Sequence, residues 1–362
     1  MQACKAIEAG ITQTVPDAEI LLFPMADGGD GFDKVLQYYL RTKTVECSTV
    51  DPLMRPISAS YQLSTVDKTA IIALSAASGL VLLKDDERNP LHTSTYGTGI
   101  MIQHAINNGA EKIILGLGGS ATNDAGMGIL AALGFQLLDG EGNPLTPTGK
   151  NLLNIQQVVP PLALPAVSFQ IASDVENILF GMAGAAFVYA SQKGASEQDI
   201  IFLDKGLQHI AEMIKQQTGK DITNIKGAGA AGGVAAGLMA YFDCGIFPGA
   251  KLVMNASNIL EEISGAALVI TGEGRLDLQS ISGKVVQHIT DLGNQYSIPV
   301  MALCGTVALD QQQIKAAGLT AAFQIIKDSI KPQYAMDNAA LLLTELSRAA
   351  IEHFLQSYKL DR

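Results

Sequence analysis

The chain has 362 residues, a formal net charge of -11, 48% hydrophobic residues, 16% charged residues and 36 glycines. The negative charge argues against nucleic acid and anionic lipid as partners, so an anionic substrate has to be held by local Lys, Arg and backbone N–H groups. The apolar, glycine-rich composition excludes a disordered chain, and the length predicts two packed α/β units.

The first half of the chain alternates helical and extended patterns. Residues 2–11 carry apolar side chains at helical spacing, and the apolar run 19–25 predicts a buried strand that ends in a glycine turn. Residues 57–63 and 69–74 alternate in polarity across a short polar turn, which predicts an antiparallel pair. We therefore expect a mixed sheet in this region.

Further along, strands are followed by glycine loops and helices. A helix over 99–108 leads into a strand over 112–117, and a second strand is expected at 168–172. In the last third, predicted strands at 267–271, 299–304 and 321–326 alternate with predicted helices at 284–295 and 311–317, before a final helix from residue 337. Such alternation predicts parallel βαβ units.

The cysteines and the N-terminal residues indicate the cellular compartment in which the protein works. The four cysteines lie far apart, without a C-x-x-C or Cys/His cluster, so neither a zinc site nor a disulfide framework is indicated. No apolar run has the length of a membrane span, and the start of the chain lacks the pattern of an export signal. These features predict a cytoplasmic protein without membrane or nucleic-acid partners.

The segment 116–124 follows a predicted strand and opens a helix. Its N–H groups and two hydroxyls can surround a phosphate at the positive end of a helix, and Asp124 can hold magnesium. The alternative is a tight turn in which Ser120 or Thr122 caps the helix and Asp124 lies in its first turn. The pattern alone leaves both open.

A second loop, 272–277, also follows a buried strand and contains Glu273, Arg275 and Asp277. Phosphoryl transfer needs carboxylates for a metal or for the attacking hydroxyl, and a guanidinium can pair with a substrate carboxylate or phosphate. The alternative is a surface ion pair between Arg275 and Asp277, which is worth little. We favour a functional loop because the glycines beside Glu273 bring the backbone close to another group.

Weaker signals come from three isolated residues. Asp27 stands in a glycine-rich turn suited to a metal or a substrate hydroxyl, whereas Asp174 and Lys193 stand in other predicted loops. A single Asp or Lys in a loop is usually only solvated.

Gly227, Gly229 and Gly232 match a dinucleotide fingerprint in spacing, but no clear strand precedes them and no acidic residue follows at the expected distance. We interpret this segment as a phosphate-binding or close-packing loop. Motifs of P-loop ATPases, elbow-type α/β hydrolases and zincins are absent from the sequence.

Together these segments resemble the glycerate kinase family that includes the bacterial glycerate 2-kinases. The resemblance covers nearly the whole chain and rests on segments 26–29, 88–90, 95–99, 118–124, 192–195, 227–233, 272–277 and 283–284. Several long motifs in one order are more specific than any single glycine loop. The family usually has a further strand and lysine-bearing loop before the helix that corresponds to residues 2–11, so we expect that part of the family's domain to be missing here.

The resemblance implies a flavodoxin-like parallel-sheet domain built from residues 1–53 and 264–362, and an inserted mixed α/β domain over 54–263. It implies ATP with magnesium as donor, D-glycerate as acceptor and 2-phosphoglycerate as the favoured product, and it leaves a homodimer open.

The residues of these loops are assigned, by role, as follows: catalytic Asp124, Glu273 and Asp277; substrate-binding Asp27, Arg275 and Lys193; cofactor-binding Gly118, Gly119, Ser120, Thr122, Asn123, Gly227, Gly229 and Gly232; metal-binding Asp124 and Asp174. Two alternatives stay open: a nicotinamide-dependent dehydrogenase, and an inactive glycerate-kinase-like binding protein.

Overall fold

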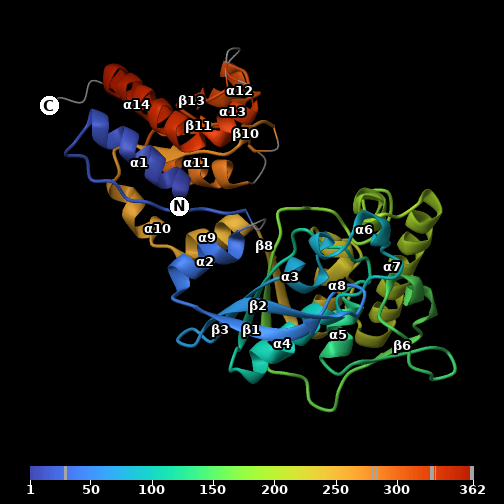
Figure 1. Ribbon diagram of the computed structural model, residues 1–362. Helices are drawn as coiled ribbons and strands as arrows, with labels where there is room; N and C mark the ends of the chain where they lie inside the picture. The colour runs from blue at the N-terminus through green and yellow to red at the C-terminus, as the bar shows by residue number, and fades with distance from the viewer. Residues whose placement is uncertain (28–30, 279, 282–283, 327–329, 331, 359–362) are drawn as a thin grey trace. The chain divides into compact units, whose positions relative to one another are not determined.

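The computed structural model describes residues 1–27, 31–278, 280–281, 284–326, 330 and 332–358 (Figure 1). The chain divides into two compact units, Met1–Met25 with Val253–Arg362, and Ala26–Leu252. The first unit is therefore built from both chain ends. The boundaries of the units differ from the predicted domain boundaries chiefly at residues 26–53, which fall in the second unit. The reason is that β1 (Lys43–Val50) pairs with β2 (Pro56–Ser64) in the sheet of the second unit.

The second unit contains a six-stranded sheet in the order β1-β2-β3-β4-β7-β8. Its remaining strands are β3 (Thr69–Ala73), β4 (Lys112–Gly116), β7 (Ser168–Ala172) and β8 (Asp243–Phe247). The β1–β2 and β2–β3 pairs are antiparallel and the others are parallel, which confirms the predicted mixed sheet. A separate antiparallel pair joins β5 (Gln136–Leu138) to β6 (Gln157–Val159).

The register of this sheet fixes where its loops emerge. Gly116 at the end of β4 pairs with Ala172, and Ala172 pairs with Phe247, so all three mark the carboxyl edge. Lys112, paired with Ser168, marks the opposite edge. The glycine loop after β4 therefore leaves the sheet at the edge where parallel α/β sheets usually bind ligands.

Helices complete this unit. They are α2 (Phe32–Leu40), α3 (Ser75–Ser78), α4 (Tyr96–Asn107), α5 (Met127–Ala132), α6 (Ala185–Tyr189), α7 (Glu197–Thr218) and α8 (Ala230–Tyr241), while α9 (Gly249–Ala256) contains the boundary. The long helix α7 has clear ends, because Ser196 and Asp199 form a reciprocal capping box and Gly219 ends it with a φ of 75°. Short 3₁₀ turns cover Leu80–Leu82, Asp85–Glu87, Gly149–Asn154 and Ser191–Lys193.

The core of the second unit is apolar and tightly packed. Ile113 and Leu115 of β4 are fully buried, and Phe169 of β7 packs edge-on against Phe242 with ring centroids 5.1 Å apart. Gly99 lets α4 approach α5, since a Cβ there would lie 2.6 Å from the Cβ of Ala132. This close packing holds the strand that carries the glycine loop.

The first unit contains a three-stranded parallel sheet in the order β13-β11-β9. Its strands are β9 (Val269–Thr271), β11 (Val300–Cys304) and β13 (Ala321–Gln324), and a short parallel ladder joins β10 (Arg275–Leu276) to β12 (Thr306–Val307). The helices are α1 (Gln2–Thr14), α10 (Ile259–Glu262), α11 (Val285–Gln295), α12 (Gln311–Ala316), α13 (Pro332–Asp337) and α14 (Ala339–Tyr358), and a 3₁₀ turn covers Ile263–Gly265. The predicted parallel βαβ units are confirmed.

Helix α1 packs on α14, with which it lies side by side in Figure 1. Gly10 permits this approach, because a Cβ there would lie 1.9 Å from Oγ of Ser347. The hydroxyl of Ser347 donates to the carbonyl of Ile7 at 3.0 Å. The two ends of the described chain are thus joined within one unit.

The predicted strand over 19–25 is wrong, because these residues form no regular secondary structure. Phe23 and Met25 instead pack against an apolar cluster that includes Ile289 and Leu292 of α11. Both side chains are only partly buried and Leu21 is 52% exposed, so the predicted burial holds only in part, and no neighbouring strand pairs with this segment among the described residues. Within the same described part of the chain, no helix combines the length and apolar character needed to cross a bilayer.

Candidate active site

The loop between β4 and α5 is held from one side and open on the other. The N–H of Leu80 donates to the carbonyl of Gly119 at 2.9 Å, and the N–H of Ala121 donates to the carbonyl of Ser78 at 2.9 Å. Gly118 and Gly119 are exposed, and Gly119 has a φ of 70° that favours glycine. No described residue accepts a hydrogen bond from their N–H groups. These donors are available to an anion.

Asp124 anchors the far end of this loop. Its Oδ2 accepts hydrogen bonds from the N–H and hydroxyl of Thr95, both at 2.8 Å, and from the N–H of Gly128 at 3.2 Å, while Oδ1 accepts from the N–H of Gly126 at 3.1 Å. Burial raises the pKa of Asp124, and the donors from Thr95 and the two glycines oppose that rise. The carboxylate ties the start of α4 to the start of α5.

These contacts bear on the predicted magnesium site. Asp124 is fully buried and both of its oxygens already accept hydrogen bonds, so its surroundings do not fit a magnesium ligand, which would need open oxygen positions and several waters. Oδ1 of Asp174 accepts from the N–H of Gly249 at 3.0 Å. In the described part of the chain, no group of three or more His, Cys, Asp and Glu side chains could hold a metal.

Lys193 lies inside the second unit, against the same loop. Its Nζ donates to Oγ of Ser120 at 2.9 Å and to the carbonyl of Thr122 at 2.7 Å, and the residue is 2% exposed. Burial lowers the pKa of Lys193 to about 7, although the carboxylate of Asp124 acts to raise it. The structure therefore brings Lys193 to the predicted phosphate loop.

The glycine loop over residues 227–233 packs against the loop over residues 116–124. A Cβ on Gly232 would lie 2.3 Å from the carbonyl oxygen of Thr122 and 2.5 Å from Cα of Asn123, and the N–H of Ala125 donates to the carbonyl of Gly232 at 2.9 Å. Gly229 donates its N–H to the carbonyl of Asn177 at 3.0 Å. The close-packing interpretation thus has a physical basis.

The dinucleotide interpretation lacks its structural context. The described element before Gly227 is helix α7, not a strand, and β8 follows α8. A dinucleotide fingerprint needs a strand that runs directly into the glycine turn.

Several buried polar atoms of this region have no hydrogen-bond partner among the described residues. They are Oγ1 of Thr122, Nδ2 and Oδ1 of Asn123, and Nε of Arg88. A buried unsatisfied polar group costs about 1–3 kcal/mol, so a group of them calls for a reason other than folding. Thr95 and Arg88 were not singled out as site residues from the sequence, and only their place in the family's motifs pointed to them.

In the first unit, the loop after β9 carries the other predicted residues. Nε of Arg275 lies 3.6 Å from Oδ2 of Asp277, and the arginine side chain is 70% exposed. The N–H of Asp277 donates to Oγ of Ser280 at 3.1 Å, and that hydroxyl donates to the carbonyl of Arg275 at 3.0 Å. The turn is braced while the guanidinium stays accessible.

The glycines of this loop differ in their packing. A Cβ on Gly272 would lie 2.0 Å from the carbonyl oxygen of Leu303 in β11, whereas one on Gly274 would meet nothing within 4 Å. The close approach expected from the sequence therefore occurs at Gly272, toward the neighbouring strand. The backbone carbonyl of Glu273 also contacts this neighbouring segment, because it accepts a hydrogen bond from the N–H of Gly305 at 3.1 Å.

Asp27 is described, but the glycines that follow it, residues 28 and 29, lie outside the described residues. Its predicted role in substrate binding stays a prediction.

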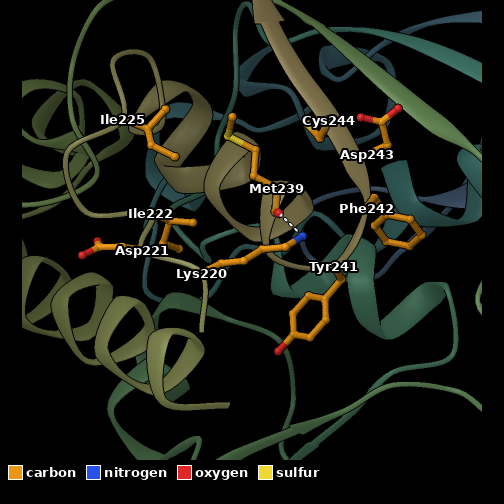
Figure 2. Close-up of a pocket in the computed structure, with 9 residues that line it drawn as sticks. All are labelled: Lys220, Asp221, Ile222, Ile225, Met239, Tyr241, Phe242, Asp243 and Cys244. Carbon is orange, nitrogen blue, oxygen red and sulfur yellow. Dashed lines mark hydrogen bonds between the residues drawn. The ribbon is translucent and has the colours of Figure 1, made fainter. Parts of the chain in front are cut away.

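A cavity of about 610 Å³ lies elsewhere in the second unit (Figure 2). Apolar side chains such as Ile222, Ile225 and Met239 line it, and Nζ of Lys220 donates to the carbonyl of Met239 at 3.0 Å. Asp243 of its lining pairs with Ser168, at the amino edge of the sheet. The cavity therefore lies at the edge opposite the glycine loop and contains none of the predicted site residues.

An α/β fold with a donor-rich glycine loop at the carboxyl edge of parallel strands is typical of enzymes that bind phosphorylated small molecules. A sequence profile of the glycerate kinase family matches residues 1–355. A glycerate kinase from Halalkalibacterium halodurans is 40% identical over 352 residues, which are 96% of this chain and 92% of that protein. The glycerate 2-kinase of Escherichia coli K12 is 38% identical over 329 residues, covering 90% and 86%.

Structural comparison agrees. A crystal structure from Salmonella typhimurium LT2, described as a glycerate kinase 2, matches with a TM-score of 0.87 at 34% identity, over 99% of this chain and 95% of that one. The chain belongs to the glycerate kinase family.

Proposed function

We propose that the protein transfers the γ-phosphoryl group of ATP to D-glycerate, with 2-phosphoglycerate as the favoured product. The observation that carries the proposal is the glycine loop after β4, whose exposed Gly118 and Gly119 offer unused N–H donors at the carboxyl edge of the sheet. The names of the similar proteins from Halalkalibacterium halodurans and Escherichia coli support glycerate as the acceptor. Four free cysteines suit a reducing cytoplasm.

In this proposal the second unit binds the donor. The N–H groups of Gly118 and Gly119 and the hydroxyl of Ser120 hold phosphate oxygens, as a backbone cradle does in other phosphate sites. The loop containing Gly227, Gly229 and Gly232 contributes by fixing the conformation of the first loop. Magnesium enters as part of the ATP substrate.

The first unit binds the acceptor. The exposed guanidinium of Arg275 can hold the glycerate carboxylate through two parallel hydrogen bonds. The carboxylate of Asp277 takes the proton of the attacking hydroxyl, while Glu273 adds a second negative charge to the loop. The hydroxyl oxygen forms a bond to the γ-phosphorus, the bond from that phosphorus to the bridging oxygen breaks, and ADP leaves with that oxygen.

A steady-state assay of ADP release tests this proposal. We expect release that depends on D-glycerate, and about a hundredfold lower kcat in Asp277→Asn, the size typical of losing a positioned acid–base group. Asp291→Asn is the matched control, because Asp291 is an exposed aspartate of α11 in the same unit that receives a hydrogen bond from Gln287. ADP release that is independent of glycerate would contradict the proposal, and binding of NAD without ATP would favour a dehydrogenase.

A further inference from the structure

The side chain of Lys193 is buried inside the second unit. It ends the 3₁₀ turn Ser191–Lys193, and the next residue, Gly194, has a φ of 92° and packs its backbone directly on the carbonyl of Arg88. Only 2% of Lys193 is exposed. A buried ammonium group is costly unless its hydrogen bonds are well made, so a lysine kept here needs a specific task.

The directions of the hydrogen bonds from Lys193 indicate the role of this lysine. In its protonated form the lysine has only donors, so Oγ of Ser120 and the carbonyl of Thr122 both accept from it. The hydroxyl hydrogen of Ser120 is then left to donate in another direction. Among the described residues, no acceptor for that hydrogen is found.

The same lysine also fixes the backbone of the loop. It donates a hydrogen bond to the carbonyl of Thr122, two residues after Ser120 in the loop. Hydrogen bonds that join Gly119 and Ala121 to the segment 78–80 hold the loop from the other side. Asp124 is the charged group that acts on the ammonium, and its own oxygens are taken by Thr95 and by backbone N–H groups. Lys193 and Asp124 therefore support the loop from inside the unit.

We propose that Lys193 is a positioning residue: it turns the hydroxyl of Ser120 so that this hydroxyl and the N–H groups of Gly118 and Gly119 point their donors at a phosphate group. The lysine itself does not contact the phosphate. This replaces the sequence-based expectation that Lys193 binds substrate directly, and it rests on the proposed function only in naming the phosphate as part of ATP.

The test is a double-mutant cycle on the affinity for inorganic triphosphate, measured by calorimetry on the full chain. Ser120→Ala removes the hydroxyl and Lys193→Met removes the group that orients it, while Lys220→Met is the control. Lys220 also donates to a backbone carbonyl in this unit, but at the opposite edge of the sheet (Figure 2). Melting temperatures are recorded for every variant.

Each single substitution at Ser120 or Lys193 is expected to weaken triphosphate binding about tenfold, as loss of one hydrogen bond to a charged group does. The double variant is expected to bind no more weakly than either single variant, because both remove the same hydrogen bond. Lys220→Met should bind like the unchanged protein. A lysine that only stabilised the fold would change the melting temperature but not this coupling.

Additive losses, about a hundredfold in the double variant, would overturn the proposal, since they would mean that Lys193 acts independently of Ser120. Unchanged binding in Ser120→Ala would overturn it even if Lys193→Met fails to fold. Failure of the proposed function has a different signature: triphosphate binds and the cycle holds, but no phosphoryl group passes from ATP to D-glycerate.

Discussion

The packing of the two glycine loops makes Gly232→Ala a sharp test of the site's architecture. The residue has a φ of 72°, and a Cβ would stand 2.3 Å from the carbonyl oxygen of Thr122, well inside van der Waals contact. The left-handed conformation costs an alanine about 1–2 kcal/mol. Displacing a packed backbone adds about 1–3 kcal/mol, because neither Thr122 nor Asn123 can move as a flexible side chain would.

Gly219→Ala is the matched control. Its φ is 75°, but a Cβ there would meet nothing within 4 Å, so only the conformational cost applies. At about 2–4 °C per kcal/mol for a unit of this size, Gly219→Ala should lower the melting temperature by about 4 °C and Gly232→Ala by about 10 °C.

Calorimetric melting curves of both variants, with kcat/KM for ATP measured beside them, provide the assay. We expect Gly232→Ala to lose affinity for ATP as well as stability, because the inserted Cβ pushes on the loop that holds phosphate. Equal melting temperatures in the two variants would refute the claim that the loop over 227–233 supports the loop over 116–124 by direct contact.

Three further predictions concern charged groups. Asp124→Asn should lower the melting temperature by several degrees as well as the turnover, because an amide nitrogen cannot accept from Thr95 or Gly128. Thermal melting checks this, and an unchanged melting temperature would contradict the anchoring role of Asp124. Because the pKa of Lys193 falls from 10.5 to about 7 on folding, the unfolded chain binds more protons between these values, so unfolding free energy should rise with pH across that window. Urea titrations at pH 7 and 9 should show this rise in the unchanged protein and a smaller one in Lys193→Met; equal rises would disprove it. Arg275→Lys should raise the KM for glycerate, since an ammonium lacks the planar fork, and an unchanged KM would show that Arg275 binds something else.

Much of the fold follows from local pattern. The strand predicted at 168–172 is β7 (Ser168–Ala172), and the antiparallel pair and the parallel C-terminal units also agree, because burial on a sheet imposes a readable spacing on apolar residues. The run 19–25 has the same apolar character without a strand partner, and sequence periodicity carries no information about pairing across the chain. The pattern was therefore wrong on the strand and only partly right on burial, since Leu21 is 52% exposed and Phe23 and Met25 are only partly buried.

For the candidate site, the sequence singled out glycine loops, but residue type and spacing did not fix what each residue does. Asp124 looked like a metal ligand because it follows a glycine loop, yet the structure surrounds it with donors from Thr95, Gly126 and Gly128. Lys193 looked like a substrate contact, and only its burial against Ser120 suggests an indirect role. Such roles depend on contacts between segments distant in sequence, which residue type and spacing do not report.

The most direct test of the account is a phosphorus NMR time course of the purified chain with ATP, magnesium and D-glycerate. The account predicts that ATP is consumed only when D-glycerate is present, and that ADP appears together with an equal amount of a phosphate monoester coupled to the proton on carbon 2. A spectrum in which ATP persists beside glycerate, or in which ADP appears with free inorganic phosphate alone, would contradict it.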